Sequence, residues 1–313
     1  MLRGLTRYQW LVIGAAWLGW GFDVFDAMLF NFVASNCIPT LLGLAPGTDE
    51  ARSATVYWTG ILSAVLLVGW AAGGVLFGWL ADRHGRRLAL MLTILAYALG
   101  TTLCAFATSI EQLTLFRALT SLGIGGEWAV GASLLVETWP KAWRPWMAAV
   151  LQTGVNVGVL FGAIFVGLLV TYMPPGNERW VFLIGVLPAL LVFWIRKHVP
   201  EPDTWQHAGH SVEKKPGAIA LFQGEVLSTT LRTTLVCALG LSAWWLFLFW
   251  QTQHLRKILV DAQTPAAEIT GLVSAAFFAF NAASVVGNFG AAWIAQHFGN
   301  RRAIVVMFIG LGS

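Results

Sequence analysis

The sequence predicts an all-α integral membrane protein with about eight to nine transmembrane helices. Apolar residues make up 57% of the 313 residues and charged residues only 11%, and the mean hydropathy is +0.70. A soluble domain carries about 25% charged residues, so a chain of this composition is typical of proteins whose solvent is lipid. The 17 Trp and 33 Gly residues agree with this, because Trp gathers at bilayer interfaces and Gly lets membrane helices approach closely.

The apolar residues form runs of about 20, which is the length of helix that crosses the hydrocarbon core of a bilayer. A further run begins at Ala303 and reaches the last residue, Ser313. The predicted spans are Leu11–Ala34, Trp58–Ala81, Leu88–Ala107, Leu113–Val136, Met147–Tyr172, Trp180–Ile195, Thr233–Trp250 and Ile269–Phe298.

One long polar segment, rich in Pro and charge, divides these spans into two groups. We expect an N-terminal six-helix half over residues 1–198, a cytoplasmic linker over 199–231, and the beginning of a C-terminal half over 232–313. Fourteen of the 19 Lys and Arg residues fall on the side of the membrane that holds the N-terminus, and four fall on the other side. The positive-inside rule therefore predicts a multi-pass protein with a cytoplasmic N-terminus.

A motif after the second span recurs after the eighth. The first copy reads Gly78-Trp-Leu-Ala-Asp-Arg-His-Gly-Arg-Arg87, and the second reads Ala292-Trp-Ile-Ala-Gln-His-Phe-Gly-Asn-Arg301. Two parallel six-helix halves joined by a central loop are an architecture of secondary transporters. The first copy resembles the signature loop of the major facilitator superfamily, which implies the major-facilitator fold of two six-helix pseudo-repeats. The resemblance implies a role in gating for Gly78, Asp82, Arg83, Gly85, Arg86 and Arg87; a merely solvated turn is the alternative.

A narrower resemblance covers roughly residues 15–205. Three segments of this sequence resemble the bacterial sialate:proton symporters, and the related aromatic-acid and metabolite:proton symporters more loosely: Asp23-Val-Phe-Asp26 with the preceding Ala15–Gly19, Gly125-Gly-Glu-Trp128 with Val136–Lys141, and Pro200-Glu-Pro-Asp-Thr-Trp205. This resemblance implies a transporter in the bacterial inner membrane that imports sialic acid or another small carboxylate by proton symport. It also implies twelve helices, so we expect this chain to be truncated and not to transport alone.

Charged residues inside the predicted spans are candidates for function, because charge within a bilayer is costly. Asp23 and Asp26 are three residues apart on one helix, and two nearby carboxylates in a low dielectric tend to share a proton. Together with Glu127 they are the predicted proton-coupling residues. Packing or interface roles remain open for the two aspartates, as does a structural hydrogen bond for Glu127.

Arg117 lies within the fourth predicted span at a depth similar to that of Asp26, so the two side chains could pair. Protonation of Asp26 would then release Arg117 to bind a substrate carboxylate; a fixed ion pair is the alternative. Polar and aromatic residues inside the spans could complete a substrate site, although helix-bonding and interface roles are common for such residues. The predicted substrate-binding residues are Arg117, Asn31, Gln152, Asn156 and Trp128.

Gly154, Gly158 and Gly162 recur at every fourth residue and predict a close-packing seam. The segment lacks the proline of the fifth-helix pattern that is typical of antiporters of the resembled superfamily, which favours import.

The sequence shows no phosphate-binding loop and no catalytic or metal-ligand spacing, so we expect no enzyme activity, cofactor or metal. The predicted partners are a small anionic substrate, H+ and membrane lipid, with no nucleic acid. Two other functions remain open: a proton-coupled exporter or antiporter of metabolites or drugs, and a non-transporting sensor on the same scaffold.

Overall fold

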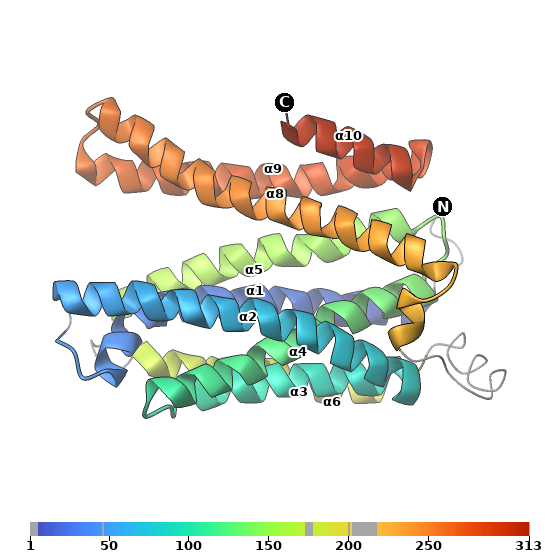
Figure 1. Ribbon diagram of the computed structural model, residues 1–313, viewed down its shortest axis with the longest axis horizontal. Coiled ribbons are helices and arrows are strands. Elements are labelled where there is room, and N and C mark those ends of the chain that lie inside the picture. The colour runs from blue at the N-terminus through green and yellow to red at the C-terminus, as the bar shows by residue number, and fades with distance from the viewer. Residues whose placement is uncertain (1–5, 46, 173–177, 200, 202–217, 313) are drawn as a thin grey trace. The chain divides into compact units, whose positions relative to one another are not determined.

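The computed structural model describes residues 6–45, 47–172, 178–199, 201 and 218–312. All regular secondary structure in these ranges is helical, and eight of the helical segments are long and apolar enough to cross a membrane (Figure 1). The elements are α1 (Arg7–Leu41), α2 (Asp49–His84), α3 (Arg86–Cys104), α4 (Ile110–Thr138), α5 (Arg144–Tyr172), η1 (Glu178–Val186), α6 (Leu187–His198), η2 (Ala218–Phe222), α8 (Val226–Asp261), α9 (Ala266–Phe298) and α10 (Asn300–Gly312). The predicted all-α membrane fold is confirmed.

Several helices extend beyond the apolar runs that predict them, because polar capping residues begin them. Thr6 and Gln9 form a capping box at the start of α1, and the Thr48 hydroxyl accepts a hydrogen bond from the backbone of Ala51 in the first turn of α2. Such caps satisfy backbone N–H groups that have no partner within the helix. An apolar window therefore locates the buried part of each helix and misses its ends.

The sixth predicted span is built from two kinds of helix. It begins as the 3-10 helix η1 and continues as α6, with Pro188 in the first turn of α6. Proline fits this position because its missing N–H would have no partner inside the helix. A Cβ atom at Gly185 would lie 2.6 Å from the Thr101 side chain of α3, so the end of η1 lies directly against α3.

The chain divides into two compact units, residues 1–213 and 214–313. In the first unit α4 packs along both α2 and α3, and α1 packs along α5 and α4; Figure 1 shows α2, α3 and α4 running side by side. Three buried apolar clusters hold these helices together. About half of the predicted linker over 199–231 lies outside the described residues. The rest includes η2 and the first turns of α8, and the role of the segment as a linker stays a prediction.

Glycine seams bring the helices of the first unit into backbone contact. A Cβ atom at Gly158 would lie 2.4 Å from the carbonyl oxygen of Gly21, and one at Gly154 would lie 2.8 Å from the carbonyl oxygen of Trp17. The predicted seam on α5 is therefore confirmed, and α1 is the helix that it contacts. A second seam, between α2 and α4, is closer still: a Cβ atom at Gly73 would lie 2.1 Å from the Leu122 carbonyl oxygen.

The second unit contains α8, α9 and α10. The rings of Phe247 on α8 and Phe280 on α9 lie 5.6 Å apart, and α10 packs against α9. Most apolar side chains of this unit are exposed, as expected for helices whose surroundings are lipid or further protein rather than water.

Candidate functional site

A buried ion pair joins α1 and α4 within the first unit. Arg117 donates a hydrogen bond through Nη1 to Oδ2 of Asp26 at 2.8 Å, and the Thr101 hydroxyl of α3 donates to Oδ1 of the same carboxylate at 2.7 Å. The Arg117 guanidinium carbon lies 4.4 Å from the ring centroid of Phe30, one helical turn beyond Asp26. Asp26 is 4% and Arg117 2% exposed. The pairing that the sequence analysis described as possible is therefore present.

Local sequence explains why three helices meet at this pair. Gly100 precedes Thr101 on α3, and a Cβ atom there would lie 2.6 Å from the backbone nitrogen of Thr120 on α4. This close approach brings Thr101 near enough to share Asp26 with Arg117. A buried ion pair needs such additional hydrogen bonds, because desolvation of two charges costs several kcal/mol per ion.

A second group of buried polar side chains lies in the same unit and has no cation within it. Asp23 of α1, Tyr97 of α3 and Glu127 of α4 are each at most 6% exposed. Oδ1 of Asp23, the Tyr97 hydroxyl and both carboxylate oxygens of Glu127 are buried without a hydrogen-bond partner among the described residues. Glu127 occupies space that Gly19 leaves open, since a Cβ atom at Gly19 would lie 1.4 Å from Oε1 of Glu127.

Tyr97 is a residue that the sequence analysis missed. Its hydroxyl is buried without a hydrogen-bond partner in the described part of the chain, as are the carboxylate oxygens of Glu127. Nothing in the sequence distinguishes Tyr97 from an interface tyrosine, because its role depends on the packing of α3 against α4 at Gly123. The structure thus brings all three predicted proton-coupling residues into the buried part of one unit, and adds a phenol to them.

The other predicted substrate-binding residues have varied environments. Asn156 on α5 is buried, and Gln152 is half-buried. Trp128 on α4 is 55% exposed and meets the Trp20 ring edge-to-face at 5.9 Å. The side chain of Asn31 lies outside the described residues. Substrate contact by these residues stays a prediction.

The residues of the signature motif form a network at the α2–α3 turn. Arg86 donates through Nε and Nη2 to the Glu137 carboxylate at 2.7 to 3.0 Å and lies 2.9 Å from the Asp82 carboxylate. Arg87 donates through its guanidinium to the carbonyl oxygen of Arg196. The network therefore joins α2, α3, α4 and α6 at one end of the unit.

Glu201 completes this network and was assigned no role from the sequence. Its carboxylate accepts hydrogen bonds from the backbone N–H groups of Arg86 and Arg87, at 2.9 and 3.0 Å. These are the first N–H groups of α3, and a helix N-terminus favours an anion. Gly85, with φ 109°, leaves room for the Glu201 carboxylate. Of the other motif residues, Gly78 has open space around it, and the Arg83 guanidinium lies over the Trp79 ring.

The second copy of the motif has the same turn. Gly299 has φ 82° and donates its N–H to the carbonyl oxygen of Ala295, as Gly85 does to Ala81. Trp293 meets Phe298 edge-to-face at 6.1 Å, and Trp79 meets His84 in the same way at 6.5 Å. The internal repeat in the sequence is therefore a repeat of structure.

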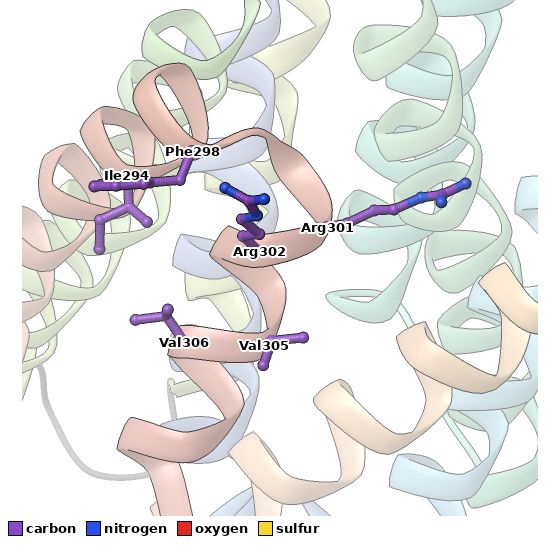
Figure 2. Close-up of a pocket in the computed structure, with 6 residues that line it drawn as sticks. All are labelled: Ile294, Phe298, Arg301, Arg302, Val305 and Val306. Atoms are coloured by element: carbon purple, nitrogen blue, oxygen red, sulfur yellow. The ribbon is translucent and has the colours of Figure 1, made fainter.

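A pocket of about 550 Å³ lies beside this second turn. Figure 2 shows its lining side chains, with the Arg302 guanidinium near Phe298 and the Arg301 side chain pointing away from both. Apart from these arginines the lining is apolar, formed by Ile294, Phe298, Val305 and Val306. None of the predicted proton-coupling or substrate-binding residues lines it.

Comparison with known proteins identifies the family. The chain is 34% identical over 230 residues to a protein of Cupriavidus pinatubonensis described as a probable 4-methylmuconolactone transporter, covering 73% of this chain and 51% of the relative. It is 32% identical over 231 residues to the sialic acid transporter NanX of Escherichia coli, covering 74% of this chain and 53% of the relative. The chain thus spans about half the length of the curated relatives it matches.

Solved structures show the same fold. The proton:xylose symporter XylE, bound to 6-bromo-6-deoxy-D-glucose, superposes with a TM-score of 0.66 at 17% identity, covering 93% of this chain and 70% of XylE. The family model of the Major Facilitator Superfamily matches residues 11–312. This multi-pass membrane protein therefore belongs to the Major Facilitator Superfamily, a family of transporters and not of enzymes.

Proposed function

We propose that the protein imports a small organic anion together with protons, by alternating access, across the bacterial inner membrane with its N-terminus in the cytoplasm. The buried Asp26–Arg117 pair carries this proposal. Arg117 is a cation held where an anion could replace its partner, and Asp26 is the partner that a proton would neutralise.

Charge balance links proton to anion. While Asp26 is ionised the pair is neutral, so a bound substrate carboxylate would leave one uncompensated negative charge in a low dielectric, which is costly. A proton on Asp26 leaves Arg117 as the counter-ion for the substrate. Arginine suits this exchange because its planar guanidinium binds carboxylates in a fixed geometry.

Thr101 and Phe30 would keep the two groups in place during the exchange. The Thr101 hydroxyl can rotate and accept a hydrogen bond from protonated Asp26 instead of donating one. Phe30 offers its ring face to the Arg117 cation, an interaction of about 0.5 to 2 kcal/mol that does not depend on Asp26. Arg117 would therefore stay in position when its ion pair opens.

The relatives support a carboxylate as the substrate. Sialic acid and 4-methylmuconolactone, named for two of them, are both carboxylic acids that Arg117 could bind. Asn31, Gln152, Asn156 and Trp128 are the proposed further contacts. The network of Arg86 with Asp82, Glu137 and Glu201 would serve as a gate at the cytoplasmic end, closing when its ion pairs form.

Uptake into proteoliposomes tests this proposal. The protein at its natural full length is reconstituted, and labelled sialic acid, then an aromatic acid, is offered with and without an inward proton gradient. We expect gradient-driven accumulation in the wild type. Asp26→Asn should abolish that accumulation and keep anion exchange, because its neutral side chain mimics the protonated state. Glu50→Gln, at an exposed carboxylate in the first turn of α2, is the matched control and should behave as wild type.

The other outcomes discriminate between functions. Full gradient-driven uptake by Asp26→Asn would show that the coupling role is wrong. Proton-driven flux out of preloaded vesicles would favour an exporter. Anion binding by the folded protein without flux in either direction would favour a sensor.

A further inference from the structure

In the described part of the first unit, buried carboxyl groups outnumber buried cations. Among the described residues, Asp23, Asp26 and Glu127 are the buried carboxyl groups and Arg117 is the one buried cation, paired with Asp26. The other buried titratable groups described in these helices are Cys37 of α1 and Tyr97 and Cys104 of α3, whereas Arg7, Tyr8, Arg86, Arg87, Glu111 and Glu137 lie near the helix ends. Between Tyr57 and Asp82 on α2, and between Arg144 and Tyr172 on α5, the sequence has no titratable residue. Arg117 already donates its hydrogen bond to Asp26, so Asp23 and Glu127 have no buried cation beside them among the described residues.

The two remaining acids differ in their surroundings. Both carboxylate oxygens of Glu127 are buried with no hydrogen-bond partner among the described residues, whereas this holds for Oδ1 alone of Asp23. An ionised carboxylate requires partners for its oxygens in a low dielectric, and a carboxyl group without them takes up a proton instead. Asp23 lies one helical turn beyond Gly19, the residue against which the Glu127 carboxyl group packs, and two neighbouring acids tend to share one proton. Glu127 is therefore the better place for that proton.

We propose that Glu127, with Asp23 and Tyr97 beside it, is a second proton-binding site that is occupied while the Asp26–Arg117 ion pair is formed. Gly19 makes the site possible, because any side chain there would fill the space of the Glu127 carboxyl group. Tyr97 adds a buried hydroxyl without a partner among the described residues, and such a hydroxyl can donate a hydrogen bond to a carboxyl group or accept one from it. The inference rests on the same set of acids as the proposed function but does not require that the proton move during transport.

The consequence is that the two proton sites are chemically different. Asp26 exchanges a proton against the charge of Arg117, whereas Glu127 holds its proton because no cation in the described part of the chain pairs with it. Loss of Asp26 should therefore leave the proton on Glu127 in place. Loss of Glu127 should leave the ion pair in place.

Infrared spectroscopy of the purified full-length protein in nanodiscs, without substrate, tests the proposal. A protonated carboxylic acid has a carbonyl stretch that an ionised carboxylate lacks. We expect this band at neutral pH in the wild type, and we expect it to shift when the protein is grown with 13C-labelled glutamate and not with 13C-labelled aspartate. This labelling changes no side chain, so it does not depend on the folding of a variant.

Variants then assign the band. Glu127→Gln should remove it, Asp26→Asn should leave it, and Tyr97→Phe should change its frequency without removing it. Absence of the band at neutral pH, a shift with labelled aspartate alone, or persistence of the band in folded Glu127→Gln would each overturn the proposal. None of these results depends on uptake, so failure of the symport proposal would be seen separately in the vesicle assay.

Discussion

The buried polar residues of the first unit differ in whether they have a hydrogen-bond or ion-pair partner. Asp26 has both a cation and a hydroxyl donor, whereas Glu127 has neither among the described residues. Both were selected from the sequence by the same argument, that charge inside a span is costly. That argument identifies the residues but cannot pair them, because pairing depends on which faces of α1, α3 and α4 meet.

The fit between Gly19 and Glu127 gives a prediction about stability. Gly19→Ala places a methyl group where Oε1 of Glu127 lies, so either the carboxyl group or the α1–α4 contact must move. We expect a loss of about 1 to 3 kcal/mol, as for other overpacked cores, measured as a lower midpoint of thermal unfolding by circular dichroism in detergent.

Two comparisons separate this clash from a general effect of alanine. Gly14 lies on the same helix, and a Cβ atom added there would have nothing within 4 Å. Gly14→Ala should therefore be neutral or slightly stabilising, because alanine has a higher helix propensity than glycine. Adding Glu127→Ala to Gly19→Ala should cost less than the two single losses together, since the second change removes the clashing group. Simple additivity would contradict the proposed contact.

Whole helices were predicted well in number and position, and less well in their contacts. The spacing of Gly154, Gly158 and Gly162 predicted a seam on α5, because a repeat of four keeps small residues on one face. The α2–α4 seam was missed although Gly69 and Gly73 on α2 are likewise four residues apart; its remaining contact comes from Gly125 on the facing helix α4. A pattern within one helix is visible in the sequence, but complementarity between two helices is not.

Adjacent glycines on α2 test the importance of this second seam. A Cβ atom at Gly73 would lie 2.1 Å from the backbone oxygen of Leu122, whereas one at Gly74 would lie 3.6 Å from the backbone oxygen of Gly125. Backbone cannot rotate away as a side chain can, so Gly73→Ala must separate α2 from α4. We expect Gly73→Ala to lower the unfolding midpoint of the purified protein clearly and Gly74→Ala to leave it nearly unchanged. Equal effects would mean that the seam does not hold the helices at this distance.

At the scale of the whole molecule, the repeat was the most informative feature of the sequence. It predicted the two copies of the turn at Gly85 and Gly299, and the structure repeats their backbone hydrogen bonds. Glu201 was beyond this reasoning, because its carboxylate reaches the first turn of α3 from a position more than a hundred residues later in the chain. Local patterns predict elements and turns, whereas contacts across the fold require the fold itself.

The orientation of the whole chain in the membrane is a prediction from charge alone. Loops that would face the cytoplasm carry most of the Lys and Arg residues, and such loops are retained on that side. Lys141, after α4, and Arg52, in the first turns of α2, are both exposed and should lie on opposite sides of the membrane.

For the test, each residue is changed to Cys in a Cys237→Ser background, because Cys237 is exposed while Cys37 and Cys104 are buried. A membrane-impermeant maleimide on intact cells should label Arg52→Cys at once and Lys141→Cys only after the membrane is opened. The reverse pattern would place the N-terminus outside and turn the proposed gate at Arg86 toward the periplasm, whereas labelling of both would mean that a span is missing between them.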